Sequence, residues 1–230
     1  MPDLSSTTVQ NVVVTVTSVT GTQISFTFHT PNGNLPSSFG NNIYIWQSGD
    51  QIPWQTTVRG QAISVNTPDG SGSFDRLSVT DSSYIIGYAV GPTDPTIKWS
   101  NYANVASSAF IPAIGSSPNP PPPPPPKSSS LTILNLGPTS AVASFNFLDG
   151  FDPQSSGAWA GIWAGQSVSY YTPPLWSSQC LGNNNSGTVS FNNIQRTRGT
   201  YYTIGLYPTG YNADPTKLKV TALAYALTFI

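Results

Sequence analysis

The chain has 230 residues, enough for one large domain or two small ones, and hydrophobic residues make up 38% of it, enough for packed cores. Only 7% of the residues are charged, with nine aspartates and no glutamate, and the net charge is −1. Without a basic cluster the chain cannot neutralise a phosphate backbone, which argues against nucleic-acid binding. We therefore expect neutral partners such as glycans or a glycosylated surface, or self-association that little net repulsion opposes.

The amino-terminal stretch MPDLSSTTVQ has neither a basic nor an apolar segment, so it does not resemble a signal peptide. We expect a cytoplasmic protein as synthesised, with release by another route left open. No apolar run approaches the roughly 20 residues that cross a bilayer, so no membrane span is predicted. The single cysteine, Cys180, excludes an intrachain disulfide.

Apolar and polar residues alternate along the first strands, with a period of two that is typical of half-buried β-structure. The alternating apolar positions are Val12, Val14, Val16, Ile24, Phe26 and Phe28. Turn sequences such as TPNGN, TPDGSG and GPTDPT separate the apolar runs, and we find no stretch with the stripe of an amphipathic helix. Six or seven strands in about 100 residues favour an antiparallel sandwich.

A proline run, Pro120 to Pro126, lies near the middle of the chain within SSPNPPPPPPPKSSS. We interpret residues 116–130 as a spacer that extends about 20 Å if its prolines adopt polyproline II. The alternative is that the run is itself a ligand for SH3-, WW- or profilin-type domains.

The two halves of the chain repeat one design. VTVTSVTGTQISFTF corresponds to LTILNLGPTSAVASFNF, Trp46 aligns with Trp163, and one Asp-Pro-Thr motif, at residues 94–96, matches another at 214–216. Landmarks that keep one order indicate an internal duplication. We predict an N-terminal β-sandwich repeat at 1–115, a Pro/Ser-rich linker at 116–130 and a C-terminal β-sandwich repeat at 131–230.

LSVTDSSYIIGYAVG and IQRTRGTYYTIGLYP resemble the corner between the fifth and sixth strands of fibronectin type III and related immunoglobulin-like domains. The resemblance implies an all-β fold of two tandem antiparallel immunoglobulin-like or fibronectin III-like sandwiches joined by a polyproline linker, and it implies no activity. It assigns Leu77 and Ile194 as apolar corner residues, Tyr84 and Tyr201 or Tyr202 as corner tyrosines, and Trp46 and Trp163 as the core tryptophans of the third strand.

The chain offers little that could catalyse a reaction. His29 is its single histidine and has no counterpart in the second half, and no pair of carboxylates recurs in both halves. The shared Asp94 and Asp214 precede prolines, which is typical of turn initiation. We predict a protein that is not an enzyme, with no cofactor and no metal site.

Aromatic residues beside prolines follow the tryptophan strand of each half, where a stiff loop can present a flat ring to a sugar. We predict a noncatalytic, bivalent, lectin-like protein, and the alternatives are a structural or self-assembling surface, matrix or inclusion protein and a receptor-binding toxin or effector. The same rings could instead cover sandwich edges or an interface between the two copies. The predicted ligand-binding residues are Gln47, Asp50, Gln51 and Trp54 in the first half and Gln166, Tyr170, Tyr171 and Trp176 in the second.

Overall fold

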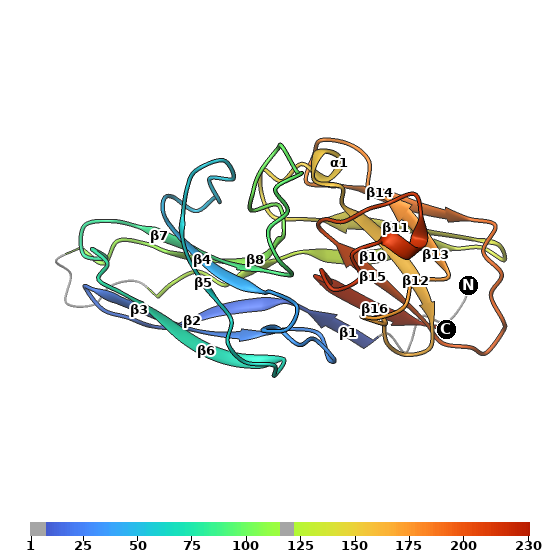
Figure 1. Cartoon of the computed structure of the whole chain (residues 1–230), viewed down its shortest axis with the longest axis horizontal. Helices are drawn as coiled ribbons and strands as arrows, with labels where there is room; N and C mark the ends of the chain where they lie inside the picture. Colours follow the sequence, from blue (N-terminus) through green and yellow to red (C-terminus); the bar gives the residue numbers. More distant parts are fainter. Residues whose placement is uncertain (1–7, 116–121) are drawn as a thin grey trace.

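The computed structural model describes residues 8–115 and 122–230, which form two β-sandwiches side by side (Figure 1). In the first sandwich a three-stranded sheet, β2–β3–β6, faces a five-stranded sheet, β5–β4–β7–β8–β9. Its strands are β2 (Val13–Val19), β3 (Gln23–His29), β4 (Asn42–Gln47), β5 (Arg59–Ala62), β6 (Asp69–Asp75), β7 (Tyr84–Ala89), β8 (Val105–Ile111) and β9 (Lys127–Ser128).

The second sandwich has the same plan, with β10–β11–β14 facing β1–β16–β15–β12–β13. Every strand pair in the described part of the chain is antiparallel, which confirms the all-β sandwich prediction. The elements are β1 (Thr8–Asn11), β10 (Ser130–Leu136), β11 (Ser140–Asn146), α1 (Pro153–Ser156), β12 (Trp159–Ala164), β13 (Trp176–Gln179), β14 (Ser186–Asn192), β15 (Tyr202–Tyr207), the 3-10 helix η1 (Pro215–Lys217) and β16 (Tyr225–Phe229).

The three-stranded sheets show the predicted alternation. In β3 the side chains of Ile24, Phe26 and Phe28 are buried in the first sandwich, whereas Thr27 and His29 on the opposite face are exposed. Successive side chains of a strand point to opposite faces of its sheet, so this sheet has one apolar face and one solvated face.

The corner tyrosines are also confirmed. The Tyr84 hydroxyl accepts a hydrogen bond from the Ser78 backbone N–H at 3.1 Å, and the Tyr202 hydroxyl accepts one from the Thr197 N–H at 2.8 Å. Tyr202, and not Tyr201, therefore occupies the corner of the second sandwich. Each bond ties the turn to the strand that follows it, as in immunoglobulin-like domains.

The central strands of the five-stranded sheets are buried on both faces, which corrects the expected place of two tryptophans. Ile43 and Ile45 of β4 face the three-stranded sheet, so Trp46 lies on the outer face of its strand. There it is covered by its own loop, since its indole N–H donates to the Thr56 carbonyl at 3.3 Å. Trp163 repeats the arrangement, donating to Thr172 at 3.2 Å. Both lie on the predicted third strand, but neither ring is between the sheets.

The two sandwiches exchange strands. β1 pairs with β16 of the second sandwich although β1 precedes the first (Figure 1). β9 pairs with β8 of the first sandwich although β9 leads into the second. Val12 is the single residue between β1 and β2, and it touches both sandwiches: its N–H donates to the Ala224 carbonyl at 3.0 Å, and its carbonyl accepts from Ser128 Oγ at 2.7 Å. Sheet membership therefore does not follow the predicted limits at 115 and 131.

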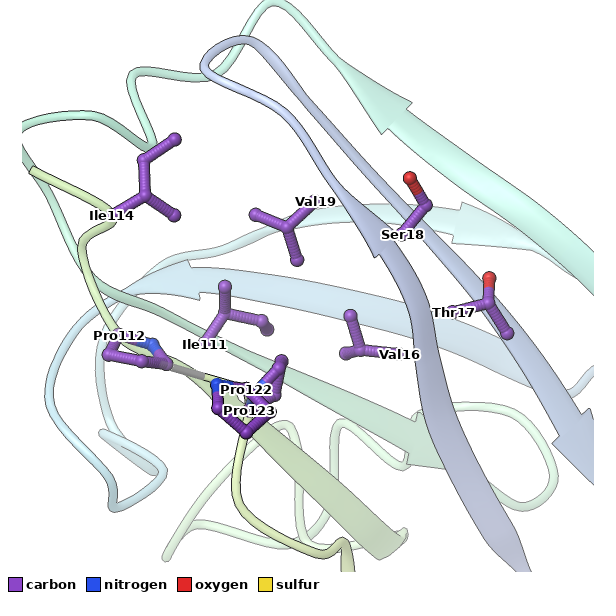
Figure 2. A pocket seen from close by; sticks show the side chains of 9 residues that line it. All are labelled: Val16, Thr17, Ser18, Val19, Ile111, Pro112, Ile114, Pro122 and Pro123. Atoms are coloured by element: carbon purple, nitrogen blue, oxygen red, sulfur yellow. The ribbon is translucent and has the colours of Figure 1, made fainter. Parts of the chain in front are cut away.

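The described part of the proline run does not separate the sandwiches, contrary to the spacer interpretation. β9 runs antiparallel to β8, with Ser108 opposite Lys127, so the chain returns along the first sandwich. Pro122 and Pro123 lie beside Val16 and Ile111 around a hollow of about 180 Å³ (Figure 2). The pairing of β9 and the apolar contact at Pro123 keep this part of the chain beside the first sandwich, although Pro122 itself is exposed. Residues 116–121, with Pro120 and Pro121, lie outside the described residues.

Candidate functional site

Trp54 reaches from the first repeat into the second. Its side chain is 7% exposed, and its indole N–H donates to the Asp149 carbonyl at 2.9 Å. The ring centroids of Trp99 and Phe151 each lie 5.4 Å from that of Trp54. Because these aromatic rings and the Asp149 carbonyl surround it, Trp54 has no free face on which a sugar could stack.

Tyr170 makes the reciprocal contact from the second repeat to the first. It is 5% exposed and stacks on Phe39 with a centroid distance of 5.3 Å, and its hydroxyl donates to the Pro31 carbonyl at 3.4 Å. Two of the aromatic rings predicted to bind sugar therefore join the two copies, which was the alternative considered for them. The apolar cores also show that the two repeats pack together, because each of the two core clusters contains residues of both repeats.

The other six predicted site residues are exposed or half-buried, and of these Tyr171 also contacts Phe39, the ring on which Tyr170 stacks. Tyr171 is 75% exposed, and Trp176 is half-buried on β13. Gln47 Nε2 donates to Ser82 Oγ at 2.9 Å, which ties this side chain to its own sandwich. The remaining exposed members are Asp50, Gln51 and Gln166.

A cleft of about 660 Å³ lies where the two repeats meet; we call it the inter-repeat cleft. Two half-buried aromatic side chains line it, Trp99 from the first repeat and Tyr211 from the second. Their polar neighbours are hydroxyl, amide and charged groups. The other lining residues are Asp94, Thr96, Ile97, Lys98, Gln154, Ser155, Ser156, Gly157 and Gly210.

The walls of this cleft are held in place by contacts behind them. Trp99 packs edge-on against Phe151 at a centroid distance of 5.4 Å, and Trp54 packs against Trp99 from the same region. The Tyr211 N–H donates to the Gly157 carbonyl at 2.9 Å, which fixes the loop after β15 against α1. Sequence reasoning missed Tyr211, because apart from Gly210 the residues that line the cleft with it lie far away in the chain and no local pattern connects them.

The two Asp-Pro-Thr motifs form the same local turn. Asp94 Oδ1 accepts from the Thr96 N–H at 2.9 Å and from Thr96 Oγ1 at 2.6 Å, and Asp214 Oδ1 accepts from Thr216 at 3.0 and 2.7 Å. Turn initiation, the predicted role, is confirmed for both. Asp94 additionally forms an ion pair with Lys219 of the second repeat.

This ion pair predicts a pH dependence of stability. Hydrogen bonding from Lys219 and then from Thr96 lowers the pKa of Asp94 from 3.8 to about 2. A carboxyl whose folded pKa is depressed stabilises the fold above its unfolded pKa and loses that contribution as the pH falls through the folded value. The free energy of unfolding of the unaltered chain should therefore fall between pH 4 and pH 2, and it should fall less in the Asp94→Asn variant. Asp81→Asn, at an exposed turn, is the control, and an unchanged acid profile for Asp94→Asn would contradict the assignment.

The residues that could take part in catalysis, His29 and Cys180, do not line the inter-repeat cleft. His29 Nδ1 lies 2.6 Å from Asp69 Oδ1 on the solvated face of the first three-stranded sheet, where both side chains are largely exposed. Burial raises the pKa of the Cys180 thiol, which disfavours the reactive thiolate. Within residues 8–115 and 122–230 no three His, Cys, Asp or Glu side chains group as metal ligands. None of the helices in these ranges has the length and apolarity to cross a bilayer.

Comparison with known proteins gives a likeness of fold only. No protein-family model matches the chain, and no curated protein matches it. A crystal structure of the chicken CNTN1 FN1-FN3 domains is similar over 86% of this chain, with 12% identity and a TM-score of 0.23, and this chain spans only 59% of its length. A marsupial T cell receptor is similar over 91% of this chain and 69% of its own, with 13% identity and a TM-score of 0.28.

Sequence identities of 12% and 13% and TM-scores of 0.23 and 0.28 carry no argument about function. The assignment of fold rests on the sandwiches themselves, in which the first, second and fifth strands face the third, fourth, sixth and seventh, and on the two corner tyrosines. The chain therefore consists of two fibronectin type III-like or immunoglobulin-like β-sandwiches.

Proposed function

We propose that this chain is a noncatalytic carbohydrate-binding protein that takes a neutral glycan in the inter-repeat cleft. The observation that carries the proposal is the pair of half-buried rings, Trp99 and Tyr211, which line one cleft from opposite repeats. Sugar rings have apolar faces that stack on such rings, and the hydroxyl and amide groups of Ser155 and Gln154 can satisfy sugar hydroxyls. The proposal keeps the expected ligand class and replaces two loop sites by one shared cleft.

The size and rigidity of the cleft support this ligand class. A volume of about 660 Å³ lies within the range of small-molecule sites, roughly 300–1,000 Å³. Trp99 is already immobilised by Trp54 and Phe151, so binding costs little further side-chain entropy. The near-neutral composition of the chain suits an uncharged ligand.

The proposal is tested by screening the full chain on an array of neutral glycans and titrating the best ligand calorimetrically. Tyr211→Ala should weaken binding about tenfold, which corresponds to roughly 1.4 kcal/mol, the scale of one lost ring contact. Gln154→Ala removes a polar lining group without touching either ring and should also weaken binding. A thermal scan of each variant confirms that it is folded.

Tyr171→Ala is the matched control, since it removes an equally large ring that is 75% exposed outside the cleft. Loss of binding in Tyr171→Ala with full binding in Tyr211→Ala would move the site to the loop after β12. A folded chain that binds none of the neutral glycans would refute the proposal.

A further inference from the structure

The described prolines, Pro122–Pro126, form a strip that is anchored at its carboxyl end. Lys127 and Ser128 follow directly as β9, and Ser107 Oγ donates to the Lys127 carbonyl at 3.0 Å. Ser128 Oγ holds the Val12 carbonyl at 2.7 Å. All peptide bonds in the described ranges are trans, and consecutive trans prolines favour polyproline II. The strip is therefore held on the first sandwich in a restricted conformation.

The exposure of the strip repeats every three residues. Pro123 and Pro126 are half-buried against the sandwich, whereas Pro122, Pro124 and Pro125 are exposed. A polyproline II helix has three residues per turn, so residues three apart share a face. Pro122 and Pro125 therefore share one exposed face with the spacing of a PxxP motif, while Pro123 and Pro126 are partly covered.

Two hollows along the strip leave room beside its proline rings. The smaller one, of about 180 Å³, lies between Pro122, Pro123 and the apolar side chains of Val16 and Ile111 (Figure 2). The larger one, of about 550 Å³, is lined by Pro124, Pro125, Ile85, Phe110, Ser108, Gly49, Asp50 and Lys127. A partner could therefore reach the outward rings and insert side chains beside them.

We propose that Pro122–Pro126 is a docking ridge for a protein domain that reads polyproline II through an aromatic-lined groove. Such domains recognise PxxP segments in polyproline II, and a proline segment already held at its carboxyl end loses less entropy on binding than a free one. Lys127 pairs with Asp149 at 2.7 Å, so its charge is already engaged. The partner therefore reads the proline rings rather than a flanking cation.

The test titrates the full chain with three purified probes: an SH3 domain, a WW domain and profilin. We expect at least one probe to bind, and the double variant Pro122→Ala/Pro125→Ala to weaken that binding at least tenfold. The matched control is Pro92→Ala/Pro95→Ala, which changes two exposed prolines of the same spacing in a different loop and should leave binding unchanged.

A synthetic peptide of residues 118–127 is titrated alongside the full chain. Binding of a probe to the intact chain that depends on Pro122 and Pro125 supports the ridge. Three outcomes overturn the proposal. Either no probe binds the intact chain, or a probe binds the peptide but not the intact chain, or the Pro122→Ala/Pro125→Ala chain binds as well as the unaltered chain.

Discussion

Replacing Trp54 by alanine is expected to lower the free energy of unfolding by about 3–5 kcal/mol, the usual cost of truncating a buried tryptophan. The change removes the indole that packs on Phe151 and donates to the Asp149 carbonyl, so it opens a void where the first repeat meets the second. Because both repeats contribute to this core, chemical denaturation followed by circular dichroism should show one cooperative transition at lower denaturant concentration.

The control for this variant is Trp176→Ala. Trp176 is also a loop-adjacent tryptophan beside prolines, but it is half-buried on the edge strand β13, so its loss should cost clearly less. Equal effects of the two substitutions would contradict the distinction between an interface ring and an edge ring. Two separate transitions in the Trp54→Ala variant would show that the repeats are independent.

Val12→Asp should have an effect of similar size, because it places a carboxylate at the point where the chain crosses between sandwiches. Val12 is 0% exposed, and its backbone bonds Ala224 on one side and Ser128 on the other. An uncompensated buried charge typically costs about 3–5 kcal/mol. Urea unfolding at pH 7 measures the loss, and hydrogen exchange at β16 should rise, since β1 would no longer hold that strand.

The same variant has a pH signature. Burial raises the pKa of a carboxyl above its unfolded value, so the penalty is smallest below about pH 4, where the group is protonated in both states, and grows as the pH rises. Val9→Asp, three residues earlier in β1, is the control: Val9 is 49% exposed, and a surface change of this kind costs about 0.5 kcal/mol or less. A Val12→Asp chain as stable as the Val9→Asp chain would contradict the strand exchange.

Several features were predictable from the sequence because they depend on residues close together in the chain. The alternation of Ile24, Phe26 and Phe28 is a local property of a strand with one solvated face. The turns at Asp94 and Asp214 depend on a side chain bonding its own backbone two residues on. The corner tyrosine Tyr84 bonds a backbone N–H only six residues away.

The candidate site was less predictable. The prolines in their loops indicated that Trp54 and Tyr170 are held rigidly. They did not indicate which residues cover the two rings. The same composition, a ring beside prolines, serves a binding loop and an interface equally well. Tyr211 could not be identified, because its place in the same cleft as Trp99 depends on how the repeats dock.

The sequence by itself determined that this protein is a nearly uncharged all-β chain and indicated two similar sandwiches, since strand period, turn chemistry and repeat spacing are local signals. Tertiary structure alone decided that the sandwiches exchange β1 and β9, that Trp54 and Tyr170 are buried between them, and that Pro122–Pro126 lies on a sheet edge. The physical reason is that many different segments could cover an apolar outer sheet face or pair with an unpaired sheet edge. Only the docking of segments that are distant in the chain determines which segment does so.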